Sequence, residues 1–155
     1  MLRDIIRPNT GSSIPLTINS VNGIVYFEDT TRSKVLSVAR ENLTFGVDHK
    51  NVSGKRWLKT TGNVVSSITG YKIPRDATIT AITIETQNIV IDGRFNIRTN
   101  GSNTNIHTTQ LSSEIEKIED NLNYNINKGD YVQVFLWVVS GDVDYPVVTI
   151  EMAWR

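Results

Sequence analysis

The C-terminal segment of the chain, Lys128–Arg155, constrains the fold more than any other part of the sequence. It contains two strand patterns, Tyr131–Val139 and Pro146–Trp154, which a short turn at Ser140–Asp142 joins. In the first pattern both alternating sets of side chains are apolar, with Gln133 as the one polar exception. A half-exposed antiparallel strand alternates apolar with polar residues, so this strand is expected to be covered on both faces.

Two covers are conceivable for the face that points away from the core of the domain. Its side chains include Tyr131, Phe135 and Trp137, and leaving such side chains in water would forfeit about 1.5–3 kcal/mol each. Either a segment of the same chain covers them, with residues 113–121 as the candidate, or a second copy of the protein does. The sequence therefore predicts these three residues as an oligomer interface, with self-cover as the open alternative.

The composition is that of one ordinary globular domain. With 155 residues, 39% of them apolar and 21% charged, the chain is long enough to bury a real core. Its 16 basic residues balance its 16 acidic residues. Sustained binding of phosphates needs a basic surplus, so nucleic acid is not expected as a partner. A net charge near zero gives little repulsion between copies, which suits a protein that works in an assembly.

Several sequence features are missing, and each excludes a class of chemistry or location. There is no cysteine, which excludes disulfides, thiolate nucleophiles and Cys-ligated zinc. The N-terminus, MLRDIIRPNTG, lacks the apolar stretch of a signal peptide, and no apolar run approaches the ~20 residues of a membrane span. We therefore expect a protein that is made in a cytoplasm and has no membrane partner.

Strand and turn signals recur about every 8–12 residues, the spacing of an antiparallel sandwich or barrel. Strands are predicted at Ile14–Ile18, Ile24–Glu28, Lys34–Val38, Asn42–Val47, Trp57–Lys59, Thr78–Glu85, Ile89–Ile91, Arg94–Thr99 and Ile106–Leu111. Asn22–Gly23 and Asp92–Gly93 have the residues of hairpin turns. The isoleucines of the Thr78–Glu85 strand change phase, and a bulge near Ala81 would restore the phase. Alternation places Phe95 inward and its neighbouring arginines outward.

One helical pattern interrupts the strands. Ser113 precedes Glu116 by three residues, the spacing of a capping box, and three apolar residues that follow fall on one helical face. The sequence therefore predicts one or two helical turns near residues 113–121, which would lie across the end of a sheet.

The search for catalytic or metal-binding residues gives no coherent site. His49 and His107 are far apart in the sequence and have no metal-ligand spacing around them. We expect the side chain of His107 to face solvent. Asp48 precedes His49, but the sequence has no nucleophile elbow, and Asp142–Asp144 lacks the further ligands of a calcium loop. We therefore predict no enzymatic activity, no catalytic residue, no cofactor and no metal ion.

The basic residues around Trp57 are the one local excess of charge. They are Lys50, Lys55, Arg56 and Lys59. Such a cluster either keeps a strand edge soluble or binds a phosphate backbone or an acidic surface, and the soluble edge is the simpler interpretation. Trp57 and Tyr71, next to loops rich in Asn and Thr, are the candidate contacts for a ligand or partner.

Four segments of the sequence share their strand pattern with a known class of protein. They are Thr31–Val38, Ser67–Gln87, Arg94–Thr99 with the polar loop after it, and the closing segment from Gly129 to Arg155. In these segments the chain resembles small β-sandwich virion proteins of tailed bacteriophages. Proteins of this kind occur as capsid decorations or head fibres and as terminal domains of tail fibres. The resemblance covers roughly residues 30–155, and it has no catalytic residues to carry over.

The resemblance implies a jelly-roll-like antiparallel sandwich that commonly forms trimers. Residues 1–30 would then be an extended arm and hairpin that docks on the particle, and residues 31–155 the sandwich domain. The implied function is a non-enzymatic capsid decoration or head-fibre protein, present in the virion as a homotrimer bound to partners such as the major capsid protein. The alternative is a tail-fibre module that binds a receptor or carbohydrate, for instance host surface glycans.

Overall fold

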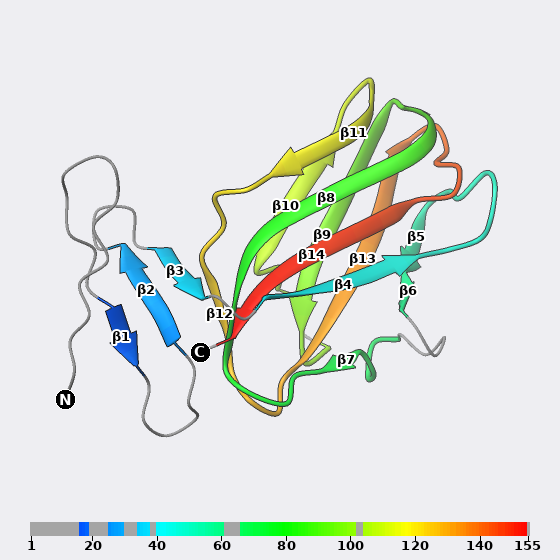
Figure 1. The fold of residues 1–155 in the computed structure, drawn as a ribbon. Helices are drawn as coiled ribbons and strands as arrows, with labels where there is room; N and C mark the ends of the chain where they lie inside the picture. The colour runs from blue at the N-terminus through cyan, green and yellow to red at the C-terminus, as the bar shows by residue number, and fades with distance from the viewer. Residues whose placement is uncertain are drawn as a thin grey trace, which may run out of the picture.

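The computed structural model describes residues 16–18, 25–29, 34–37, 40–60, 66–101 and 104–154, in which there are three antiparallel sheets and no helix (Figure 1). Two of the sheets stack face to face in two layers, and this confirms the all-β sandwich. The described residues contain no helix long and apolar enough to cross a membrane.

The first layer is a five-stranded sheet. Its strands are β5 (Lys55–Trp57), β7 (Tyr71–Lys72), β9 (Asp92–Thr99), β10 (His107–Leu111) and β13 (Tyr131–Ser140). The order is β10-β9-β13-β5, and β7 pairs with the beginning of β13 beside β5. The strand predicted at Tyr131–Val139 is therefore the centre of this sheet, with β9 on one side and two short strands on the other.

The second layer is a six-stranded sheet. Its strands are β4 (Arg40–Gly46), β6 (Lys59–Thr60), β8 (Ala77–Val90), β11 (Glu114–Glu119), β12 (Tyr124–Ile126) and β14 (Val147–Trp154). The order is β11-β8-β14-β4-β6, and β12 pairs with the beginning of β8. Leu58, which is fully buried, lies between β5 and β6, so the chain crosses there from one layer to the other.

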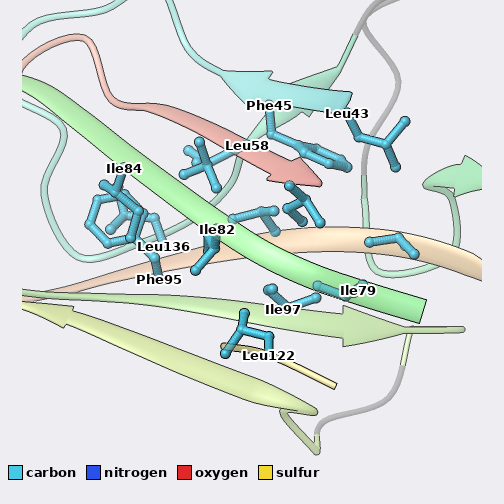
Figure 2. Close-up of a cluster of buried hydrophobic side chains, with 14 of the residues drawn as sticks. Leu43, Phe45, Leu58, Ile79, Ile82, Ile84, Phe95, Ile97, Leu122 and Leu136 are labelled. Carbon is cyan, nitrogen blue, oxygen red and sulfur yellow. The ribbon is translucent and has the colours of Figure 1, made fainter. Parts of the chain in front are cut away.

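Apolar side chains from both layers fill the space between the sheets (Figure 2). Phe45, Ile82 and Ile84 come from the six-stranded sheet, and Phe95 and Leu136 come from the five-stranded sheet. All five are fully buried. The alternation of each strand therefore sends one set of side chains into a common core, as two packed sheets require.

The bulge predicted near Ala81 is confirmed. Glu151 of β14 is opposite Ala81, whereas Met152, the next residue, is opposite Ile79, so β8 has one extra residue at Thr80. This insertion changes the phase of the strand, which lets Ile79 and Ile82 both point into the core.

The helix predicted near residues 113–121 is wrong, because this segment is strand β11, paired with β8. Ser113 has a φ of 59°, a left-handed conformation that an N-cap residue does not adopt. Its side chain therefore cannot cap a helix there. The long strand β8 needs a hydrogen-bonding neighbour, and pairing with β11 overrides the local helical pattern.

The turn predicted at Asp92–Gly93 lies one residue earlier. Strand β9 already begins at Asp92, since Gly93 pairs with Leu111 of β10 and with Val138 of β13. The bend between β8 and β9 is at Ile91. A β-carbon on Gly93 would lie 2.8 Å from the side chain of Val90, so the close approach of the two strands favours glycine.

A third, separate sheet precedes the sandwich. It has the strands β1 (Leu16–Ile18), β2 (Val25–Asp29) and β3 (Lys34–Ser37) in that order, all antiparallel. The turn predicted at Asn22–Gly23 lies outside the described residues, as do residues 1–15. The division into an arm of residues 1–30 and a sandwich of residues 31–155 remains a prediction.

Candidate functional site

The outward face of the five-stranded sheet collects aromatic and cationic side chains from three strands. Residues directly opposite each other on paired strands point to the same face. Phe135 is opposite Trp57, and Trp137 is opposite both Lys55 and Arg94. Arg98 lies four residues after Arg94 on β9 and so points to the same face. We call the set of these side chains the cation–aromatic face: Lys55, Trp57, Arg94, Arg98, Phe135 and Trp137.

Arg98 stacks on two of the aromatic rings. Its Cζ lies 4.2 Å from the ring centroid of Phe135 and 5.5 Å from that of Trp57. The rings of Trp57 and Phe135 meet edge to face, with centroids 4.7 Å apart. The guanidinium Nε also donates to Oδ1 of Asn105, at 2.7 Å. Burial lowers the pKa of Arg98, but a guanidinium remains charged in proteins.

Trp137 lies between two cations. Nζ of Lys55 and Cζ of Arg94 are each 5.1 Å from its ring centroid. Attraction of this kind at an exposed site contributes about 0.5–1 kcal/mol. The side chain nevertheless remains 38% exposed, and Val139 beyond it is 44% exposed. The cations therefore cover this end of the face only in part.

The other end of β13 is covered by a loop of the same chain. Gln133 is fully buried, and its Nε2 donates to the carbonyl oxygens of Ser66 and of Thr69, the latter at 2.9 Å. Its Oε1 accepts from the N–H of Gly101, at 2.9 Å. Self-cover is thus real for part of the strand, but residues 66–70 provide it rather than residues 113–121.

Tyr131, the third predicted interface residue, lies at this covered end. Its ring is next to Gly70 and Gly101, and Nζ of Lys72 is 5.9 Å from the ring centroid. Gly101 has a φ of 69°, and a β-carbon there would collide with the carbonyl oxygen of Ser67, so the turn requires glycine. Of the three predicted residues, Phe135 and Trp137 therefore lie on the open part of the face.

Tyr71 does not share a face with Trp57. It is opposite Val132, an inward-facing residue, and its hydroxyl donates to Oε1 of Glu41 in the six-stranded sheet, at 2.8 Å. The hydrogen bond to this carboxylate is the largest cause that raises the pKa of Tyr71, followed by burial and by the negative charge of Glu41. The tyrosine joins the two layers, and its hydroxyl is engaged within the chain.

Trp57 also lines an open groove of about 1010 Å³ at the edge of the sandwich. The groove lies where β4, β5 and β6 meet the segment before β14. Its polar lining includes Asp48, His49, Arg56 and Lys59. The basic cluster of the sequence is thus divided, with Arg56 and Lys59 at the groove and Lys55 on the cation–aromatic face.

His107 belongs to a polar network between the layers and does not simply face solvent. Its Nε2 lies 2.6 Å from Oε2 of Glu119 on β11, and its Nδ1 lies 3.1 Å from the hydroxyl of Tyr124 on β12. Only 14% of its side chain is exposed. The expectation of a solvent-facing histidine is wrong, because pairing of β11 and β12 with β8 places their polar side chains beside β10.

Among the residues that the structure describes, no three histidines, aspartates or glutamates come together to hold a metal ion. Asp144, considered for calcium, accepts the N–H of Asn51 through its carboxylate, at 2.6 Å. Alternation in the sequence predicted that Arg94 and Arg98 point outward, but not that they stack on aromatic rings. Two arginines four residues apart lie on the same face of a strand, and this spacing could have indicated stacking on aromatic residues of a neighbouring strand.

The comparisons with known proteins add a likeness to a solved structure. The chain is similar to the PRD1 vertex protein P5. The two share 10% sequence identity, with a TM-score of 0.48, over 89% of this chain and 85% of the other. No protein-family model matches the sequence, and no curated protein matches it. Similarity at this level assigns neither a family nor a function, and the function is argued below from the chain's own surfaces.

Proposed function

We propose that the protein is a non-enzymatic structural protein of a phage particle, a capsid decoration or head fibre that assembles as a symmetric oligomer. The observation that carries the proposal is the cation–aromatic face, an open sheet surface suited to protein contact. Its location on a particle is supported by the sequence resemblance of Ser67–Gln87 and of the closing strands. The partners would be other copies of the chain and the major capsid protein.

The composition of the face supports a role in protein contact. Trp and Arg are the residues that most often dominate the energetics of protein interfaces. Here two tryptophans, a phenylalanine and two arginines are held on neighbouring strands of a rigid sheet, and Trp137 is open to solvent. A partner that covers Phe135 and Trp137 would remove their remaining apolar surface from water.

The experiment is binding of the purified protein to particles that lack it. Co-sedimentation of the chain with such particles, and its density on their heads by electron microscopy, would support the decoration. Binding to tails, or to no part of the particle, would contradict the head location. Arg75→Glu, an exposed change in the bend before β8, is the control for nonspecific effects of charge.

A receptor- or glycan-binding module of a tail fibre is the second candidate, and the groove beside Trp57 favours it. Its volume of about 1010 Å³ can accept a saccharide, and Trp57 and Tyr145 supply aromatic surface. The test is binding of purified chain to host surface glycans. This function would be favoured over decoration if the wild-type chain binds the glycans, Trp57→Ala abolishes that binding, and the wild-type chain does not bind particles.

A further inference from the structure

The cation–aromatic face has a charge that restricts what can cover it. Lys55, Arg94 and Arg98 all lie on it, and within the described residues none of the three forms an ion pair with a carboxylate. If the same faces of two copies met, these cations would be brought together, and like charges in an interface oppose association. The face therefore suits a partner that is both acidic and apolar.

The chain itself carries a surface of that kind on strand β11, at the edge of the six-stranded sheet. Ile115 is 49% exposed and Ile118 is 68% exposed, and no residue of the strand is buried. Glu116 shares the outward face of the strand with Ile118. Directly opposite Glu116 on β8 lies Glu85, which is also exposed. Glu85, Glu116 and Ile118 therefore share one outward surface, which we call the acidic–apolar strip.

The strip breaks two local rules of sheet stability. Like charges that are directly opposite on paired strands destabilise a sheet, and Glu85 and Glu116 are such a pair. An exposed isoleucine at the edge of a sheet invites pairing or aggregation. Both costs would be offset if a cationic and aromatic surface covered the strip. Local conflicts of this sort are expected where a surface has a function.

The two surfaces are complementary and belong to different sheets of one chain. We propose that the acidic–apolar strip of one copy docks on the cation–aromatic face of the next, so that the copies form a closed ring. Contact between two different surfaces is the kind that generates rings, and an odd-numbered ring such as a trimer requires it. The net charge of zero agrees, because each copy carries both signs. This contact rests on the self-assembly in the proposed function and specifies its geometry.

Charge reversal tests the contact. The face variant is Lys55→Glu with Arg94→Glu, and the strip variant is Glu85→Lys with Glu116→Lys. Light scattering should show the wild-type chain at about 52 kDa, three times the 17.4 kDa of one chain, and each variant alone at 17.4 kDa. All four changes in one chain should restore the large species. The Arg75→Glu control should behave like the wild type.

Mixing tests whether the two variants complement each other. The native strip of the face variant fits the native face of the strip variant, and the two reversed surfaces also fit each other, so a mixture regains contacts that neither variant makes alone. It should give species of about 35 kDa, twice the mass of one chain, or larger. Contact between like faces would instead leave the strip variant alone at the wild-type mass. Three results would each overturn the proposed contact. The face or strip variant could keep the wild-type mass, the mixture could stay monomeric, or the four-fold variant could fail to assemble.

A second measurement does not depend on charge-reversed chains folding. Because the chain has no cysteine, single cysteines can be introduced and joined by a short bifunctional maleimide. Lys55→Cys with Glu116→Cys in one chain should give a ladder of dimers and trimers, whereas either single variant should give none. Dimers from Lys55→Cys alone would show that like faces meet, which contradicts the proposal.

Failure of this contact and failure of the proposed function give different results. If the wild type is an oligomer that the reversals leave intact, self-assembly stands and only this contact is overturned. A monomeric wild type that binds particles leaves decoration standing, but it overturns the ring and leaves the face for another acidic protein. A chain that binds no particle overturns the proposed location, whatever its oligomeric state.

Discussion

At the scale of single residues, Phe135 and Trp137 differ in exposure, although both were predicted as interface residues. Phe135 is half-buried under Arg98 and against Trp57, whereas Trp137 is 38% exposed between two cations. Truncating Phe135 therefore removes packing within one chain, and truncating Trp137 removes mainly surface that only a partner could cover. The two substitutions separate the stability of the monomer from its association.

We expect Trp137→Ala to lower the mass of the oligomer towards 17.4 kDa while the free energy of unfolding of the monomer falls by less than about 1 kcal/mol. Phe135→Ala should lower that free energy more, by about 2 kcal/mol, because its ring contacts are internal. Light scattering and urea denaturation measure the two effects. A Trp137→Ala chain that remains fully assembled would remove Trp137 from the interface.

Tyr71 is the second informative residue, because its hydroxyl is bound to Glu41. Its pKa is raised in the folded chain by that bond, by burial and by the charge of Glu41. A phenol with a raised pKa favours its neutral form in the folded state. Its stabilising contribution is thus fully present below the unfolded pKa of about 10, and it is lost as the pH rises through the folded pKa.

Tyr71→Phe should therefore lower the free energy of unfolding by about 1 kcal/mol at pH 7. The difference from the wild type should shrink as the pH is raised above about 10, because the wild type then loses this contribution. Urea denaturation at pH 7 and at alkaline pH tests the expectation. A constant difference across that range would show that the hydrogen bond to Glu41 is not its cause.

At the scale of secondary-structure elements, the segment before β11 shows how tertiary pairing overrides a local pattern. The sequence Ser113–Glu116 has the spacing of a helix cap, yet Ser113 adopts a left-handed conformation and β11 follows. A helix of one or two turns makes few hydrogen bonds, all within its own segment, whereas pairing with β8 satisfies backbone groups along both strands. The larger number of hydrogen bonds decides the outcome.

The substitution Ser113→Gly distinguishes a strand that begins after Ser113 from a helix capped by Ser113. In a strand that starts after a residue with positive φ, glycine relieves the steric cost, and the free energy of unfolding should rise by about 0.5–1 kcal/mol. At the N-cap of a helix the same substitution would lower it by a few tenths of a kcal/mol. Thermal denaturation gives the sign. A lower melting temperature would argue against the left-handed turn.

The loop of residues 66–70 is the element that covers part of β13. It is held by Gln133, whose amide reaches the carbonyl groups of Ser66 and Thr69 and the N–H of Gly101. Gln133→Ala would leave these buried groups without partners and should cost about 2–3 kcal/mol. Urea denaturation measures the loss, and proteolysis within the loop should become faster. Wild-type stability would show that the loop does not depend on Gln133.

At the scale of the whole molecule, two surfaces of the sandwich have opposite character. The five-stranded sheet presents cations on aromatic rings, and the edge of the six-stranded sheet presents carboxylates and exposed isoleucines. A chain with zero net charge can therefore be strongly polarised between surfaces. This arrangement favours defined contacts between copies over unspecific association, because only unlike surfaces attract.

Because the two surfaces carry opposite charges, self-association should be sensitive to salt. Exposed charges are screened as ionic strength rises, and at 1 M salt the screening length is only about 3 Å. We expect the dissociation constant of the oligomer to increase at least several-fold between 0.05 and 0.5 M salt. Light scattering across dilutions at both salt concentrations measures it. An association that tightens with salt would point to a purely apolar interface instead.

Much of the fold could be predicted from local patterns. Alternation in Tyr131–Val139 and Arg94–Thr99, and the change of phase in Thr78–Glu85, determine which side chains face the core, because a strand has a period of two residues. Tertiary structure alone decided which strands are neighbours. It placed Trp57 beside Phe135, the arginines of β9 over the rings of β13, and β11 along β8 as a strand. Such contacts join residues far apart in the chain, and pairing of whole strands outweighs the preferences of any short segment.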